Sequence, residues 1–186
     1  MQRFQKQDTP RRRGGFTLVE VMITLTVVSV AVYLMSSTIT ATMVHSSARK
    51  ERTLAVETAM NVLERMRAVP FDELYALYNS DPSDDPDGNN SAPGPHFDVP
   101  GLHPIDGQPA IGTIVMPQLE GQLRENINIP ELGLPRDLNG DLIVDGFDHS
   151  DDYKVLPIEV RVEWKGNSGK GLLVMSSMFS SVQKQL

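Results

Sequence analysis

The sequence predicts an α+β protein in which one long N-terminal helix packs against a small antiparallel sheet. Three features of the 186-residue chain support this fold class. No glycine or proline interrupts residues 16–69, so a single helix can run through them. The segment 79–109 is dense in Pro, Gly, Asp and Asn, which is typical of a loop. Near the C-terminus, apolar and polar residues alternate with the period of two expected for strands with one buried face.

Composition narrows the functional classes. The net charge of −7 is unevenly distributed, because basic residues gather before Gly15 while the rest of the chain is acidic. An acidic body argues against a nucleic-acid-binding protein, which needs a clustered basic face. The chain has no cysteine, so disulfides and thiolate metal sites are excluded. We call residues 1–15 the leader; its basic residues are Arg3, Lys6, Arg11, Arg12 and Arg13.

An apolar run begins at Phe16 and continues to Met35 with a single charged residue, Glu20. A run of about 20 apolar residues is long enough to cross the hydrocarbon core of a bilayer as a helix. The basic leader precedes the run, so the positive-inside rule keeps the leader in the cytoplasm and exports the acidic remainder. We therefore predict a single membrane span.

Three other interpretations of this run remain open. A secretory signal peptide would need a cleavage site such as Ser29–Ala31, but the apolar run is long for such a peptide. A twin-arginine export signal would need a hydrophobic residue soon after Arg13, where the sequence has two glycines. The third interpretation is a plain membrane anchor in which the glycines have no role.

The helix is predicted to continue beyond the span through residues 45–70. This segment carries small and apolar residues at helical spacing, with most of its charged residues on other faces. One face of the helix is therefore available to pack on a globular domain of the same chain. The residues of this face are Ala55, Ala59, Val62, Leu63, Met66 and Val69.

The junction between the leader and the span resembles the type IV prepilin family, which includes pilus subunits and the pseudopilins of type II secretion. The resemblance rests on the sequence GGFTLVE at 14–20 and directly covers about residues 1–70. It implies a pilin-like fold, cleavage by a prepilin peptidase after Gly15, and methylation of the new amine on Phe16. It also implies that other pilin or pseudopilin subunits are partners, and that Glu20 meets the N-terminal amine of a neighbouring subunit.

Elementary electrostatics supports this role for Glu20. A lone charge at the bilayer centre costs roughly 2.5–3.5 kcal/mol, whereas a carboxylate and an ammonium group attract strongly in a low-dielectric bundle. The pairing forms only when two helices are offset by the correct distance, so Glu20 would set the register of assembly. Gly14 and Gly15 present no side chains and leave the backbone open to the peptidase. The alternative is a shallow Glu20 whose carboxylate reaches the membrane interface.

The same resemblance implies a single-pass protein of the inner membrane with its head in the periplasm, later incorporated into a filament. The segments 55–75 and 162–166 are most similar to minor pilins of the type IV pilus modification class. A minor pseudopilin of type II secretion, or an exported membrane-anchored module that does not polymerise, are the alternatives. The implied organisation is a leader at 1–15, a transmembrane and assembly half-helix at 16–44, an amphipathic half-helix at 45–70, and a head at 71–186.

After Pro70 the sequence predicts a short helical turn, then the loop at 79–109, and then a strand at Ala110–Met116. Farther along, apolar residues alternate with Glu159, Arg161 and Glu163, as in a strand with one buried face. A second strand follows a Gly-Asn-Ser-Gly turn and completes an antiparallel hairpin. The apolar face is predicted to consist of Ile158, Val160, Val162 and Trp164 in the first strand and Leu172, Val174 and Met178 in the second.

The segment Asp137–Asp148 resembles the calcium loops of dockerins and related repeats. It places side-chain oxygens at loop positions 1, 3, 5, 9 and 12 and a carbonyl at position 7, which suits a Ca²⁺ ion. It departs from the pattern at position 6, where Leu142 replaces the usual glycine, while Gly140 lies two residues earlier. The alternative is an Asx-rich surface turn. The candidate ligands are Asp137, Asn139, Asp141, Ile143, Asp145 and Asp148.

No catalytic constellation is evident in the sequence. The segment 166–171, GNSGKG, is predicted to be a hairpin turn, because it lacks the spacing of a phosphate loop and lies between two strands. The four histidines show no arrangement that identifies a general base for Ser168. The sequence therefore predicts a structural subunit and not an enzyme.

Overall fold

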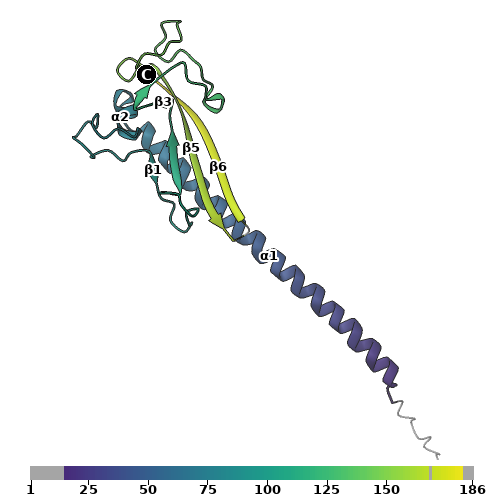
Figure 1. Ribbon diagram of the computed structural model, residues 1–186. Coiled ribbons are helices and arrows are strands. Elements are labelled where there is room, and N and C mark those ends of the chain that lie inside the picture. The colour runs from purple at the N-terminus through teal and green to yellow at the C-terminus, as the bar shows by residue number, and fades with distance from the viewer. Residues whose placement is uncertain (1–14, 168, 182–186) are drawn as a thin grey trace, which may run out of the picture. The chain divides into compact units, whose positions relative to one another are not determined.

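The computed structural model describes residues 15–167 and 169–181. The chain divides into an N-terminal unit, Met1–Met43, and a C-terminal unit, Val44–Leu186. The helix α1, Leu18–Arg67, begins in the first unit and ends in the second (Figure 1). A long N-terminal helix and an antiparallel sheet of four strands confirm the predicted pilin-like α+β fold class.

Thr17 caps the start of α1. Its side-chain Oγ1 accepts a hydrogen bond from the main-chain NH of Glu20 at 3.2 Å, which satisfies one of the amides that a helix N-terminus leaves free. Glu20 also places an acidic residue in the first turn, where the helix dipole favours negative charge. Thr17 and Glu20, both within the sequence GGFTLVE, therefore help to fix where the helix begins.

The part of α1 in the N-terminal unit is long and apolar enough to cross a membrane. Its most apolar 18-residue window has a mean hydropathy of 2.2, and none of that window is buried within the protein. Six hydroxyl groups of this part donate to main-chain carbonyls four residues earlier in the helix, so they do not need water as a partner. These residues are Thr24, Thr26, Ser29, Thr38, Thr40 and Thr42.

The C-terminal unit contains a four-stranded antiparallel sheet with the strand order β1-β2-β5-β6. β5 and β6 pair along their whole length, which confirms the predicted hairpin. The turn predicted at 166–171 is shorter than expected, because Gly166 belongs to β5 and residues 169–171 belong to β6, while Ser168 lies outside the described residues. The strand predicted at 110–116 is confirmed as β2. The strands are β1, His96–Phe97; β2, Gly112–Val115; β5, Val155–Gly166; and β6, Gly169–Ser180.

Short elements complete the C-terminal unit. A 3-10 helix, η1, and the short helix α2 form the predicted helical turn after Pro70, and a second 3-10 helix, η2, contacts β5. A separate two-stranded antiparallel sheet joins β3 to β4. The bounds are η1, Phe71–Glu73; α2, Leu74–Tyr78; β3, Gln118–Leu119; β4, Gln122–Leu123; and η2, Pro130–Leu132.

The core of the C-terminal unit lies between α1 and the sheet. The predicted helix face is confirmed, because five of its residues are buried and Val69 is partly buried against the same cluster. Ala55 and Ala59 are fully buried, which lets other side chains of the core approach the helix backbone closely. The sheet contributes the buried residues Ile114, Leu156, Ile158, Val160, Val162 and Trp164.

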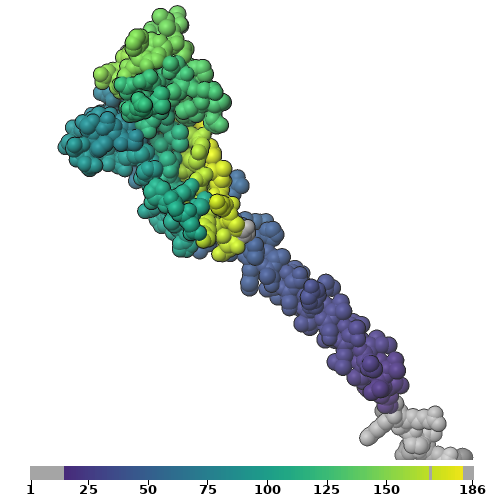
Figure 2. Space-filling view, viewed as in Figure 1, coloured from purple at the N-terminus to yellow at the C-terminus, as the bar shows by residue number. Residues whose placement is uncertain are grey.

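The predicted face of β6 is wrong. Leu172, Val174 and Met178 are exposed, whereas the alternate residues of the strand are partly buried against the core. The register explains the difference, because Met175 is paired with the buried Val160 and paired residues lie on the same face of a sheet. Apolar residues occur on both faces of β6, so the sequence alone does not fix which face is buried. In Figure 2 the yellow strand β6 lies at the surface of the C-terminal unit.

The polar face of β5 is also not uniformly exposed. Glu159 is only 1% exposed, although it alternates with the buried apolar residues. Its Oε1 accepts hydrogen bonds from Arg161 at 2.7 Å and 3.0 Å, so the buried carboxylate has a charged partner. A charge buried without such a partner would strongly destabilise the fold.

The predicted loop at 79–109 is fastened to the core at several points. Val99 and Leu102 are buried, and β1 pairs with β2. Phe97 of β1 covers Gly112 of β2, and a Cβ at that glycine would overlap the Phe97 ring. The loop is therefore a covering segment of the C-terminal unit as well as a connection.

Candidate functional site

The predicted processing and assembly residues lie at the start of α1. Gly15 and Phe16 precede the helix, and Phe16 is 82% exposed. A peptidase could therefore approach the peptide bond between Gly15 and Phe16 without unfolding a helix. Gly14, the other glycine of the motif, lies outside the described residues.

Glu20 lies in the first turn of α1 with an exposed side chain. Its main chain is fully engaged, because its NH donates to Thr17 and its carbonyl accepts from the hydroxyl of Thr24 at 2.7 Å. Within residues 15–167 and 169–181, its carboxylate has no hydrogen bond or ion pair with another side chain. The acid therefore stands among exposed apolar neighbours such as Val19 and Val21.

The predicted calcium loop follows η2 and precedes β5 as a series of turns. Asp137 accepts main-chain NH groups from Gly140 at 2.5 Å and Leu142 at 2.8 Å. Desolvation opposes the charge of Asp137, but these main-chain hydrogen bonds hold the pKa of its carboxyl below the ordinary value. Asn139 and Asp141 likewise accept the NH groups two residues ahead of them, at 3.0 Å and 2.8 Å.

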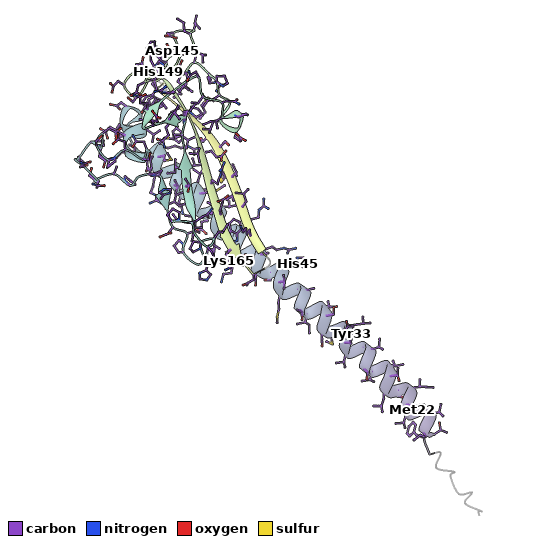
Figure 3. The ribbon with its side chains drawn as sticks, viewed as in Figure 1. Met22, Tyr33, His45, Asp145, His149 and Lys165 are labelled. Atoms are coloured by element: carbon purple, nitrogen blue, oxygen red, sulfur yellow. The ribbon has the colours of Figure 1, made fainter. Side chains whose placement is uncertain are left out.

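A second group of ligand-type side chains forms at the same end of the C-terminal unit. Glu125, Asp145 and His149 each offer one atom, and the three atoms lie within 4.8 Å of one another. The Nε2 of His149 is 3.2 Å from Oδ1 of Asp145 and 3.8 Å from Oε2 of Glu125. Figure 3 shows Asp145 and His149 close together, at the opposite end of the unit from His45 and Lys165.

Hydrogen bonds to β4 hold the His149 segment in place. The main-chain NH of His149 donates to the carbonyl of Leu123 at 2.9 Å, and the NH of Leu123 donates to Asp148 at 3.1 Å. Glu125 follows β4 by two residues, so this pairing brings it beside His149 despite their separation in the sequence.

Glu125 is fully buried, and its two carboxylate oxygens have different surroundings. Oε1 accepts main-chain NH groups from Leu138 at 2.5 Å and Asn139 at 3.1 Å. Among the described residues, Oε2 has no hydrogen-bond partner, and it lies 3.8 Å from Nε2 of His149. A buried carboxylate oxygen without a partner is costly, so this atom requires an explanation.

The opposite nitrogen of His149 is oriented by Asp152. Nδ1 lies 3.0 Å from Oδ1 of Asp152, and the amide nitrogen of Asn139 donates to the other oxygen of that carboxylate at 3.0 Å. Although Asn139 also lies 3.4 Å from Nδ1, its amide is a donor, so we assign the Nδ1 proton to the bond with Asp152. In the neutral ring, the lone pair of Nε2 then faces Asp145 and Glu125.

Electrostatics favours positive charge at this position. Burial disfavours the charged imidazolium, but the hydrogen bonds to Asp152 and Asp145 and the charge of Glu125 outweigh that effect. The pKa of His149 is therefore raised above its ordinary value. A hydrogen bond from Asn139 is the main cause that lowers the pKa of Asp152.

The structure brings together only part of the predicted calcium set. Among the described residues, the one group of three or more His, Asp or Glu ligand atoms contains Asp145 but not Asp137, Asp141 or Asp148. Sequence reasoning missed Glu125 and His149. The nearest sequence signal was that His149 directly follows the acidic segment, while nothing near Glu125 indicated that β4 would carry it to the same place.

Comparisons with known proteins support the N-terminal part of this description. Residues 10–32 match the prokaryotic N-terminal methylation motif. The match includes Gly14, Gly15, Phe16 and Glu20, together with the first part of the apolar helix. Searches of curated proteins and of solved structures gave no significant match.

Proposed function

Because residues 10–32 carry the N-terminal methylation motif that is the signature of type IV pilins and pseudopilins, we propose that this protein is a structural subunit of a pilin-type filament. The observation that carries the proposal is the position of the motif. It lies directly before a 50-residue helix whose first part is apolar and exposed and whose last part packs on a sheet.

The exposed apolar part of α1 needs a surrounding other than water. Residues such as Leu25, Val28 and Leu34 are each more than half exposed, and a soluble protein rarely leaves such a large continuous apolar surface uncovered. Lipid would cover it before assembly, and the helices of neighbouring subunits would cover it afterwards. The hydroxyl groups bonded within the helix suit both surroundings.

Glu20 has the properties that the assembly role requires. Its carboxylate is exposed in the first turn of α1 and lacks a charged partner among the described residues. Cleavage after Gly15 would create an ammonium group on Phe16 of every subunit. In a low-dielectric bundle, pairing this group with Glu20 of a neighbour would offset the cost of burying each charge.

The order of the segments gives the location. The leader at 1–15 would remain in the cytoplasm, one span within 16–44 would cross the inner membrane, and the amphipathic segment 45–70 with the head at 71–186 would lie in the periplasm. Prepilin peptidase and other pilin or pseudopilin subunits are the partners. The role is structural and not enzymatic.

We place the protein with the minor pilins of the type IV pilus, on the similarity of segments 55–75 and 162–166. A minor pseudopilin of a type II secretion system is the second candidate, since the methylation motif is shared by both systems. A third candidate is a membrane-anchored exported module that never polymerises. The effect of Glu20 on assembly separates the third candidate from the first two.

The test compares wild type with Glu20→Ala in a native host that lacks its own copy. The assembly role predicts that both proteins insert in the inner membrane, while Glu20→Ala is lost from the purified filament fraction and from crosslinks to other subunits. Glu57→Ala, at an exposed position of the same helix, is the matched control and should behave as wild type. Equal incorporation of Glu20→Ala would favour the anchored module.

We also propose that the segment Asp137–Asp148 binds Ca²⁺. The ligands would be Asp137, Asn139, Asp141, Asp145 and Asp148 with the carbonyl of Ile143. Leu142 supports this proposal, because it adopts a φ of 70° and donates its NH to Asp137. It stands at loop position 6, where calcium loops use glycine for a sharp turn. Calorimetric titration of the full-length protein with Ca²⁺ tests the proposal; the absence of both heat and thermal stabilisation would oppose it.

A further inference from the structure

We propose that Glu125, Asp145 and His149 form a binding site for a divalent transition-metal ion, with Zn²⁺ as the representative ion. The inference does not depend on filament assembly, and it is distinct from the calcium loop, with which it shares only Asp145. It accounts for the one carboxylate oxygen of Glu125 that is buried without a partner.

The spacing of the three ligand atoms fits such an ion. In a tetrahedral zinc site, bonds of about 2.0–2.2 Å place neighbouring ligand atoms roughly 3.3–3.6 Å apart. The distances from Nε2 of His149 to Asp145 and Glu125 are 3.2 Å and 3.8 Å. The oxygens of Asp145 and Glu125 lie within 4.8 Å of each other, so the side chains close the site by moving toward an ion between them.

Surrounding hydrogen bonds orient two of the three ligands, His149 and Glu125. Asp152 holds Nδ1 of His149, in the carboxylate–histidine arrangement that commonly orients a metal-binding imidazole. Two main-chain NH groups hold Oε1 of Glu125, which leaves Oε2 for the ion. The side chain of Asp145 is 28% exposed, so solvent has access from its side and can supply a fourth ligand.

The donor set favours a transition metal over calcium. An imidazole nitrogen suits Zn²⁺, whereas Ca²⁺ and Mg²⁺ prefer sites made of oxygen atoms. Two carboxylates would balance the charge of the ion in a buried position. The green and yellow-green segments that carry the three residues lie together at one end of the C-terminal unit (Figure 2).

A charged His149 without a metal is the competing explanation. An imidazolium could donate from Nε2 to Asp145 at 3.2 Å and from Nδ1 to Asp152 at 3.0 Å. It would still leave Oε2 of Glu125 at 3.8 Å, too far for a hydrogen bond. A metal ion at the centre of the three ligand atoms would give each of them a bonding partner, including Oε2 of Glu125.

The test uses full-length protein in detergent, purified without a histidine tag and freed of metal. Zn²⁺ binding is measured by calorimetric titration, and Co²⁺ is used as a probe whose visible absorption reports coordination by nitrogen and oxygen. Wild type is expected to bind one ion per chain. Asp145→Asn removes a ligand, and Asp152→Asn removes the group that orients His149, so each should weaken binding at least tenfold.

Asp151→Asn is the matched control, because it makes the same change of charge at an exposed neighbouring position and should bind as wild type does. Every variant keeps all the histidines of the chain, so zinc bound at other histidines would be the same in Asp151→Asn, Asp145→Asn and Asp152→Asn. Absence of a Co²⁺ spectrum in wild type would overturn the proposal, even if the variants failed to fold. Equal affinities of all four proteins, or displacement of Zn²⁺ by an equal concentration of Ca²⁺, would also overturn it.

Discussion

The indole Nε1 of Trp164 donates a hydrogen bond to Oε2 of Glu51 at 3.2 Å, which ties β5 to α1 within the C-terminal unit. The other oxygen of Glu51 accepts the main-chain NH of Asn167 at 3.3 Å. One carboxylate therefore fastens both the strand and the turn of the β5–β6 hairpin to the helix. Trp164 is the single tryptophan of the chain, so its fluorescence reports on this contact.

Replacing Glu51 with Ala should loosen the hairpin. The change removes two hydrogen bonds to a charged acceptor, which are worth about 1.5–3 kcal/mol each when buried and less at this partly exposed position. We expect a loss of roughly 1–2 kcal/mol in the free energy of unfolding. Urea unfolding followed by Trp164 fluorescence measures it, with Glu57→Ala as the control; equal stability of the two variants would contradict the role given to Glu51.

Gly171 should not tolerate a side chain. It is paired with Trp164 across the hairpin, and a Cβ at this position would overlap the indole ring. Gly171→Ala should cost about 1–3 kcal/mol, the usual range for overpacking, and should shift the emission of Trp164. Lys170→Ala, at the exposed neighbouring position, should leave both the stability and the emission unchanged.

Replacing Leu142 with glycine should stabilise the folded protein. It is 92% exposed and has a φ of 70°, a left-handed conformation that costs an L-residue roughly 1–2 kcal/mol. Glycine removes that cost but loses about 0.5–1 kcal/mol through the greater freedom of the unfolded chain. Leu142→Gly should therefore raise the free energy of unfolding by roughly 0.5–1 kcal/mol. A lower melting temperature for this variant would show that the strain is absent.

Alkaline pH should destabilise the C-terminal unit through its buried tyrosines. Burial raises the pKa of Tyr153 to about 12, against the opposing effect of the hydrogen bond from the NH of Tyr75, and burial also raises the pKa of Tyr75. The unfolded chain loses these protons near pH 10, whereas the folded protein keeps them. The contribution of these tyrosines to stability should therefore be fully present below about pH 10 and be lost as the pH rises toward 12.

Tyr153→Phe distinguishes this cause from general alkaline denaturation. The variant loses the hydroxyl that donates to Phe71 at 2.5 Å, so it should be less stable than wild type at neutral pH. Its stability should fall less steeply above pH 10, because one of the three buried phenols, Tyr75, Tyr78 and Tyr153, is gone. Urea unfolding between pH 8 and pH 11, followed by circular dichroism, gives the stability of each protein and its change with pH. If the stabilities of wild type and Tyr153→Phe fell equally with pH, the role given to Tyr153 would be contradicted.

The long helix and the final hairpin could be predicted from the sequence because their signals are local. Uninterrupted helix-compatible residues predicted α1, and the alternation from Ile158 to Trp164 predicted β5. The buried face of β6 was not predictable in the same way, since Leu172 to Met175 are apolar on both faces and pairing decides between them. The burial of Glu159 depended on its partner Arg161 and on the cover that other segments provide.

The same distinction applies to the candidate sites. The methylation motif is contiguous, so its residues could be read directly from the chain. The Glu125–Asp145–His149 group depends on a hydrogen bond between His149 and β4, which no local pattern records. The calcium ligands were predicted from spacing, and Asp145 is the one of them that the structure places in the three-residue group.

Mass spectrometry of the N-terminus of the protein purified from its native host tests the pilin-type role most directly. The role predicts that the leader is absent and that the chain begins at Phe16 with a methylated amine. A protein that retains residues 1–15, with no methyl group on Phe16, would contradict it and leave only a membrane-anchored exported domain.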